Sequence, residues 1–477
     1  MPSPTLDPRT ARLLPWIVAS ALFMQMLDGT ILNTALPAMA HDLAEDPLRM
    51  QSVVIAYMLS VAVLMPASGW IADRFGTRRV FLGAVLLFTF GSLVCALSET
   101  LVELVAARVL QGCGGALMMP VGRLVVLRAY PRKDLVRVLS FITMPALIGP
   151  LIGPTLGGWL VEYASWHWIF LINLPVGLLG CLAALSLMPD LRGPRTPFDV
   201  PGFLLFGAAM LLLSIALEGL GELKLPHDRV MLLLFAGMGC LSAYWLRAGI
   251  IAQPLFPTSL FHTRTFAIGI LGNLFTRIGS GALPFLTPLL LQVALGYSPA
   301  QAGMSMIPQA LGAMAVKPVV TPLIQRLGYR RILVGNTLVL GLLLAGMGLV
   351  DGDTPYALLL GLLALLGAVN SLQFTAMNTV ALIDLDENNA SGGNSLLSVV
   401  VQLSMSFGVA SAAALLGGFS AGSTLHGGLS VLAAFQATYL CVGLLSMIGA
   451  LLFMQLSPQA GRNAREGGTE LPPANGK

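Results

Sequence analysis

Fourteen long apolar stretches limit the folds that this chain of 477 residues can adopt. Each holds about 20 mostly apolar residues, the length that a helix needs to cross the hydrocarbon core of a membrane. Only 10% of the residues are charged, against about a quarter in soluble proteins. We therefore expect an all-α polytopic membrane protein. Its 14 transmembrane helices are expected at roughly 14–38, 51–71, 80–98, 102–127, 138–162, 168–188, 200–219, 230–250, 266–292, 299–322, 331–350, 356–383, 392–418 and 430–455.

The basic residues predict the orientation of these spans. Of the 26 Lys and Arg residues, nineteen fall on the side of the two termini, three on the other side and four within spans. Because basic loops stay in the cytoplasm, we expect both termini to be cytoplasmic. The first apolar stretch is too long for a cleavable signal peptide and lacks a small-residue cleavage site.

A short basic turn occurs twice in the chain. Arg74-Phe-Gly76-Thr-Arg78-Arg79 returns 252 positions later as Arg326-Leu-Gly328-Tyr-Arg330-Arg331. Two copies of one turn at a fixed offset indicate two related halves. We expect the following division: a cytoplasmic N-terminus (1–13), a six-helix bundle (14–188), a linker with two additional helices (189–265), a second six-helix bundle (266–456) and a disordered cytoplasmic tail (457–477).

Four motifs support this division. They are the turn itself, Arg108-Val-Leu-Gln111-Gly112-Cys-Gly114-Gly115 on the fourth span, the run from Gly149 to Gly158 on the fifth, and Leu27-Asp28-Gly29-Thr30 leading to Pro37 on the first. Together they resemble the signature motifs of the major facilitator superfamily. The fifth-span run, the fourteen spans and Trp166-His-Trp168 resemble the 14-spanner drug:proton antiporter branch, closest to MdtD-type multidrug exporters.

The resemblance implies a fold, an activity and roles for several residues. It implies two six-helix bundles plus two inserted helices, and proton-coupled efflux across a bacterial inner membrane. It implies a proton relay at Arg108 and a latch for one alternating-access state at the first turn: Gly69, Asp73, Arg74, Gly76, Arg78 and Arg79. It implies that the fifth-span motif seals one face against leak: Gly149, Pro150, Gly153, Pro154, Gly157 and Gly158. From the residues alone, Gly69 and Gly76 permit a tight turn, and the fifth-span glycines predict a kinked, closely packed helix.

Asp28 is the acidic residue nearest the middle of any span. An ionised side chain there costs at least about 2.5–3.5 kcal/mol, so such residues are candidates for function. A buried carboxyl can take up and release a proton unless a cation pairs with it. Asp28 is therefore our candidate for proton coupling together with Arg108, and the alternative is a permanently ionised partner in a structural salt bridge.

Four cations against one central acid give the spans an excess of positive charge. Such a cavity would attract an organic anion, or a metal–carboxylate chelate such as iron–citrate, more than a lipophilic cation. This is the alternative to drug export. Our candidates for the substrate cavity are Gln25, Arg123, Arg277, Lys317, Asn370, Gln373 and Asn378. Arg123 and Lys317 can instead snorkel to the interface.

Other classes of function fit less well. All loops are short, so a receptor has no soluble sensing domain, and duplicated halves suit rocking better than a channel. No phosphate-binding loop, metal cluster or nucleophile–base pair occurs, so we expect no enzyme, no metal and no cofactor beyond the proton gradient. The five Cys lie apart within apolar runs and predict no disulfide framework. Expected partners are the lipid bilayer, protons and a small-molecule substrate, with no nucleic acid, and the chain is expected to work as a monomer.

Overall fold

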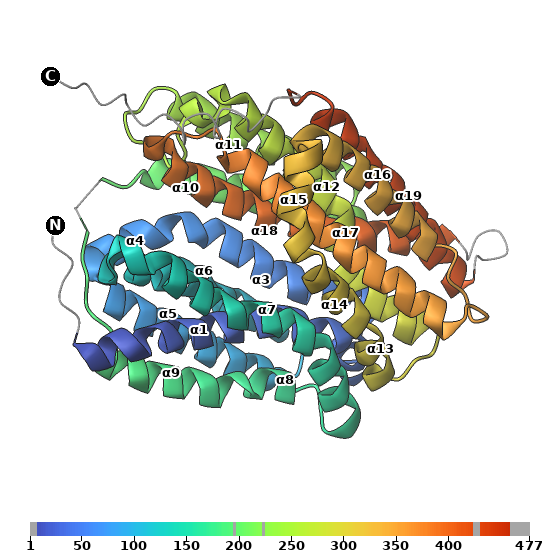
Figure 1. Cartoon of the computed structure of the whole chain (residues 1–477). Helices are drawn as coiled ribbons and strands as arrows, with labels where there is room; N and C mark the ends of the chain where they lie inside the picture. The colour runs from blue at the N-terminus through green and yellow to red at the C-terminus, as the bar shows by residue number, and fades with distance from the viewer. Residues whose placement is uncertain (1–6, 194–196, 222–224, 423–429, 458–477) are drawn as a thin grey trace, which may run out of the picture.

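A computed structural model describes residues 7–193, 197–221, 225–422 and 430–457. Every regular element in these residues is a helix, and the helices form two groups that lean against each other (Figure 1). The expected tail at 457–477 lies, from residue 458 on, outside the described residues. The boundaries of the five expected segments stay predictions.

The first group, the N-half, is drawn in blue to green at the lower left of Figure 1. Its longest helices, α6 and α7, have 29 and 32 residues. Its elements are α1 (Pro8–Ile31), η1 (Leu32–Thr34), α2 (Leu36–Asp42), η2 (Pro47–Met50), α3 (Gln51–Leu64), η3 (Met65–Ala67), α4 (Ser68–Phe75), α5 (Thr77–Ala96), α6 (Leu101–Ala129), α7 (Arg132–Tyr163), α8 (Trp168–Leu171) and α9 (Asn173–Leu187).

The second group, the C-half, is drawn in yellow to red at the upper right. Its elements are α12 (Arg264–Leu289), the π-helical turn η5 (Leu290–Ala294), α13 (Pro299–Ser305), α14 (Ile307–Ala315), α15 (Lys317–Leu327), α16 (Tyr329–Met347), α17 (Tyr356–Leu382), α18 (Glu387–Gly422) and α19 (Val431–Phe453). Between the halves in the chain come α10 (Val200–Gly221), α11 (His227–Ala248) and η4 (Thr258–His262).

The inserted pair α10–α11 packs where the two halves meet. Buried side chains of both helices share an apolar cluster with α3 of the N-half and α18 of the C-half, among them Leu59, Phe206, Tyr244 and Leu396. Helices α3 and α18 also contact each other directly. The pair therefore lies beside a junction between the halves rather than on a remote surface.

The count of fourteen spans is not confirmed. Among the described residues, twelve helices are long and apolar enough to cross a membrane, or thirteen if the bent pair Pro299–Ala315 and Lys317–Leu327 is one span. The fifth expected span falls in α7, which is not among them. The bent pair turns by 47°, and it carries the tenth expected span.

The repeated basic turn is shorter than the sequence predicts. Helix α4 runs to Phe75 and α5 begins at Thr77, so Gly76 alone connects them, and Gly328 alone connects α15 to α16. Both glycines have positive φ, +94° and +80°, which suits a residue without Cβ. The prediction that Gly69 takes part in the turn is wrong. Gly69 lies inside α4, which continues to Phe75. An added Cβ at Gly69 would meet nothing within 4 Å, so no close contact requires a glycine there.

Candidate functional site

Asp28 lies at the centre of a polar network inside the N-half. Helix α1 places it among α5, α6 and α9, where only 1% of its surface is exposed. One carboxylate oxygen, Oδ2, accepts a hydrogen bond from Arg108 Nη1 at 2.7 Å. The other, Oδ1, accepts from Gln111 Nε2 at 2.8 Å and from Asn173 Nδ2 at 2.9 Å. Three donors on three side chains therefore surround a single buried carboxylate.

Arg108 is as deeply buried as Asp28 and has further partners of its own. Its Nη1 also donates to Gln111 Oε1 at 2.5 Å, and its Nε donates to the carbonyl of Val53 at 3.3 Å. The guanidinium lies 4.3 Å from the centre of the Tyr57 ring, a cation–π contact. These contacts join α6 to α3, so removing the charge of Asp28 would affect the packing of several helices.

Ser92 of α5 completes the network. Its Oγ accepts from Gln111 Nε2 at 2.7 Å and from Asn173 Nδ2 at 3.3 Å. The two proton-coupling candidates of the sequence analysis, Asp28 and Arg108, are in direct contact in the structure. Gln111, Asn173, Ser92 and Tyr57 were not predicted, although three of them are polar residues within apolar stretches, which is a usable signal.

A buried ion pair of this kind has a definite chemistry. Both charges have left water, and their attraction offsets that cost only while each keeps its hydrogen bonds. Loss of the charge on Asp28 would cancel the attraction to Arg108, and Arg108 bonds to α1, α3 and Gln111. The network therefore couples the charge of one side chain to contacts between helices.

Arg277 lies in the C-half, away from this network. Its Nε donates to Asn273 Oδ1 on the same helix at 2.9 Å, and its guanidinium lies 4.3 Å from the centre of the Phe374 ring on α17. Its Nη2 is buried without a hydrogen-bond partner, and no acidic residue in the described part of the chain forms an ion pair with it. The charge of Arg277 is thus not neutralised by any carboxylate that the structure describes.

The remaining cavity candidates are scattered. Gln373 is buried and directed at α16, where it donates to Thr337 Oγ1 at 2.7 Å and accepts from Asn336 at 2.7 Å. The others divide by exposure: Gln25 is buried one turn before Asp28, Asn370 and Asn378 are half-buried, and Arg123 and Lys317 are exposed. These side chains do not form a single cluster with Asp28.

The first basic turn is held by its own half. Asp73 accepts a hydrogen bond from Arg128, at the end of α6, at 2.5 Å. Thr77 N donates to the carbonyl of Leu191 at 3.0 Å, which fixes the segment after α9 against the turn. Of the remaining latch candidates, Arg74 and Arg79 are exposed and Arg78 is half-buried. The described partners of Asp73 and Thr77 therefore lie on α6 and in the segment that directly follows α9.

The fifth-span motif makes a close contact between helices. A Cβ added at Gly149, Gly153 or Gly157 would collide with α1, against Leu27, Thr30 and Ile31 respectively. These glycines lie four residues apart and so share one face of α7. The close packing expected of this helix is observed.

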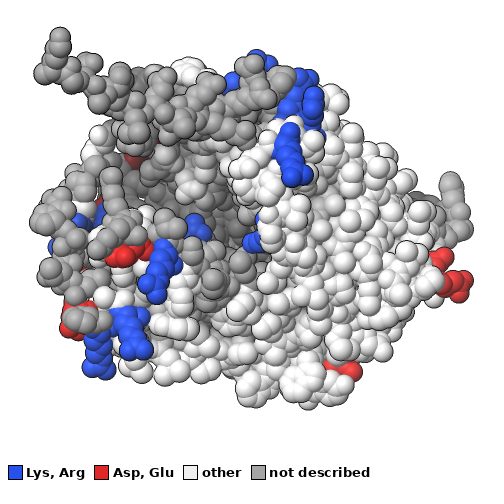
Figure 2. Space-filling model, in the orientation of Figure 1, with Lys and Arg blue, Asp and Glu red and all other residues white. Residues whose placement is uncertain are grey.

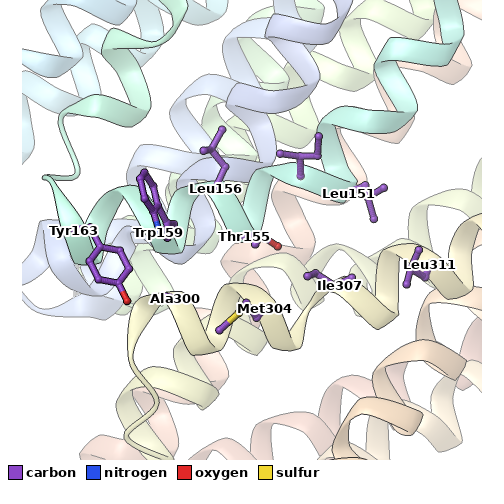
Figure 3. A pocket seen from close by; sticks show the side chains of 10 residues that line it. Leu151, Thr155, Leu156, Trp159, Tyr163, Ala300, Met304, Ile307 and Leu311 are labelled. Atoms are coloured by element: carbon purple, nitrogen blue, oxygen red, sulfur yellow. The ribbon is translucent and has the colours of Figure 1, made fainter.

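The same helix closes one end of the molecule against the C-half. A Cβ at Gly158 would collide with the carbonyl of Pro299, and Thr155 Oγ1 donates to the carbonyl of Gly303 at 3.3 Å. Glu162 Oε2 accepts from Ser298 Oγ at 2.6 Å and from Ala300 N at 2.9 Å. Beside this closed end, α7 and α14 diverge and leave a groove of about 560 Å³ with an almost wholly apolar lining (Figure 3).

The opposite end carries the two basic turns and is open. The two turns lie at one end because an even number of helix crossings separates them along the chain. Figure 2 shows a hollow between the halves on the side where α1 begins and α4 ends in Figure 1, with Lys or Arg side chains on its wall. We call this the basic end. In the described part of the chain no three His, Cys, Asp or Glu residues are arranged to hold a metal ion.

Comparison with known proteins decides the family. Residues 18–409 match the Major Facilitator Superfamily. The chain belongs to this superfamily. It is accordingly a membrane transporter.

Within the major facilitator superfamily, the chain is similar to curated relatives that share one name. The chain is 49% identical over 441 residues to a protein of Serratia proteamaculans named "Putative multidrug resistance protein MdtD", with 92% of each chain covered. It is 50% identical over 438 residues to the protein of that name from Pectobacterium carotovorum, with 92% and 94% covered. The resemblance to MdtD-type proteins is thus confirmed over nearly the whole chain.

Solved structures of the superfamily share the fold. An auto-inhibited POT family peptide transporter aligns with a TM-score of 0.71 at 16% identity, covering 94% of this chain and 97% of that one. A bacterial homologue of the human lysosomal transporter Spinster, in an inward-facing and unoccupied conformation, aligns with a TM-score of 0.65 at 14% identity, covering 96% and 98%. At these identities the likeness concerns the fold alone.

Proposed function

We propose that this protein is a proton-coupled efflux transporter of the bacterial cytoplasmic membrane, which exchanges protons for small molecules by alternating access. It would work as a monomer, without a cofactor and without an enzymatic step. The observation that carries the proposal is the position of Asp28, a buried carboxylate held by three donors and less than two helical turns from the contacts that close one end of the molecule.

The connection runs along helix α1 and its continuation. Thr30 Oγ1 donates to the carbonyl of Gly149 on α7 at 3.4 Å, and the carbonyl of Thr34 accepts from Gln292 of the C-half at 3.0 Å. A proton on Asp28 would loosen the attachment of α1 to α6 and α9, and the same helix would transmit the change to the closed end. This is the two-state element that alternating access requires.

The direction of transport follows from the orientation that the basic residues predict. If the basic end faces the cytoplasm, the hollow of Figure 2 is open to the cytoplasm and the end at Glu162 and Ser298 is closed to the outside. This state would receive a substrate from inside the cell. The relatives named as multidrug resistance proteins support small toxic molecules as the first substrates to test.

The test is substrate-driven proton movement in proteoliposomes that contain the purified protein. Asp28→Asn keeps the size of the side chain and one acceptor oxygen but removes the titrating group, so we expect proton movement to fall to the background of empty liposomes. Asp199→Asn is the matched control, because Asp199 is also a buried acid paired with an arginine, Arg247 Nε at 3.2 Å, but lies just before α10 and outside the network. Full proton movement in Asp28→Asn would refute the role of Asp28.

A second candidate function is the export of organic anions or metal–carboxylate chelates such as citrate and iron–citrate. Arg277 favours it, since its guanidinium is buried between α12 and α17 and no described acid neutralises it. The same liposomes separate the two functions when a panel of lipophilic cations is compared with citrate and iron–citrate. Arg277→Gln should lower anion transport about tenfold or more, as expected for a lost charge-assisted contact. Arg49→Gln, an exposed arginine paired with Glu45, is the control, and unchanged anion transport in Arg277→Gln would end this alternative.

A further inference from the structure

A second lateral groove lies on the N-half, beside the inserted helix α10. It has a volume of about 550 Å³ and is bounded by α3, α6 and α10. Helix α6 contributes Val105, Val109 and Cys113, which share one face because they lie four residues apart. None of the lining residues belongs to the network around Asp28, so the groove is separate from the proposed coupling site.

The side of α10 that lines this groove changes from apolar to polar along the helix. Gly207, Leu211, Ser214 and Glu218 line it at spacings of three and four residues, so they follow one another along one side of the helix. The face is apolar at the start of the helix and ends in a hydroxyl and a carboxyl group. From Phe203 to Glu218 the lining extends for about 22 Å, at about 1.5 Å per residue.

Glu218 has no protein partner in the described part of the chain. No hydrogen bond or ion pair to its carboxyl group is found there, although the side chain is only partly exposed within an apolar groove. Ser214, one turn earlier, is 1% exposed, and its Oγ also lacks a hydrogen-bond partner. Two polar side chains that lack a partner among the described residues are costly in an apolar environment, and they therefore point to a ligand.

The groove of Figure 3 shows that lateral grooves need not carry such groups. Its volume is nearly the same, about 560 Å³, yet Thr155 and the hydroxyl of Tyr163 are the main polar groups in its lining, and no acidic residue is present. Any acyl chain can fill a groove of that kind. The groove beside α10 differs by one carboxyl group at one end, which selects for a positive charge on its occupant.

We propose that this groove binds a protonated lipophilic amine, a single ammonium group on an elongated apolar body. The ammonium N–H groups would donate to the carboxylate of Glu218 and to Ser214 Oγ. The apolar body would lie along Leu211 and Gly207, against Val105 and Val109 of α6. The inserted helix α10 thus completes a binding site with α3 and α6 of the N-half, separate from the network around Asp28.

The test is photolabelling of the full-length protein in nanodiscs. The probe is dodecylamine with a photoactivatable diazirine in its chain, and the labelled peptides are identified by mass spectrometry. We expect labels on α10 and on α6 near Val109. Glu218→Gln should lower this labelling about tenfold or more, and Ser214→Ala should lower it less, because only the former removes the charge-assisted contact.

Controls make the outcome specific to the groove. Glu103→Gln removes an exposed carboxyl group from the first turn of α6, two residues before Val105, and should leave labelling unchanged. Asp28→Asn should also leave it unchanged, which separates this proposal from the proton-coupling role. Equal labelling of wild type and Glu218→Gln, or equal labelling by the diazirine analogue of dodecanol, would overturn the proposal and mean that the groove only takes up acyl chains. Competition by phosphatidylethanolamine but by no soluble amine would also overturn it, in favour of a lipid.

Discussion

The two halves share a framework but differ in charge. In the N-half, Gln111 of α6 donates to Ser92 of α5, and in the C-half Gln373 of α17 donates to Thr337 of α16. These helices hold equivalent positions, the fourth and third of each half. The amide-to-hydroxyl bond therefore recurs in both halves, as expected for a duplicated chain.

The charges around this shared bond differ. In the N-half the amide also contacts Asp28 and Arg108, so acid and base are paired. In the C-half the amide of Gln373 accepts a hydrogen bond from the neutral Asn336. The buried Arg277 donates to Asn273 and lies over the ring of Phe374, and it has no described acidic partner. The repeat thus preserved the packing of the helices, while the proton-binding chemistry we propose is confined to one half.

The largest expected effect comes from removing one arginine from each half. Arg108→Met leaves the carboxylate of Asp28 buried without its cation, which should cost about 3–5 kcal/mol of folding stability. Arg277→Met removes a charge that no described acid neutralises, so its stability should be unchanged or higher. Thermal unfolding of both variants in detergent, with exposed Arg49→Met as the control, makes the comparison. Equal losses in Arg108→Met and Arg277→Met would contradict the assignment of the charge pair to the N-half.

A smaller difference is expected for the shared amides. Gln111→Ala breaks contacts with Asp28, Arg108 and Ser92, and should cost about 2 kcal/mol. Gln373→Ala breaks only neutral contacts and should cost about 1 kcal/mol. The same unfolding measurement applies. A larger loss in Gln373→Ala would show that the C-half framework, and not the charged network, carries more of the stability.

The smallest effect is expected at the two turn glycines. Each alanine replacement should cost about 1 kcal/mol because its φ is positive. Gly76→Ala should cost more than Gly328→Ala, since its new methyl group would collide with the carboxylate of Asp190. Chemical denaturation of the two variants measures the difference. If Gly328→Ala proved the more damaging, the segment after α9 would not be packed on the first turn as described.

The apolar stretches were enough to predict an all-helical membrane protein, although the count of fourteen spans is not confirmed. The ends of the helices could not be predicted in the same way, because a helix continues past the apolar region when nothing ends it. Gly69 is the example: the apolar pattern suggests a turn there, while α4 runs on to Phe75 and only Gly76 ends it.

The site was harder to predict than the fold. Asp28 stands out in the sequence because a carboxyl group in a membrane span is costly. Its amide partners, Gln111 and Asn173, are 83 and 145 residues away in the chain, and only the packing of α1, α6 and α9 brings them together. The direction of the Gln373 side chain, toward α16, likewise depends on which face of α17 is buried.

The most direct test of a proton site in the N-half is infrared difference spectroscopy of the protein in liposomes as the pH is lowered. Protonation of a buried carboxylate produces a carboxylic-acid band that can be assigned by mutation. The account predicts such a band in wild type and in Asp199→Asn, and its loss in Asp28→Asn. A band of full intensity that persists in Asp28→Asn would place the titrating group elsewhere and contradict the account.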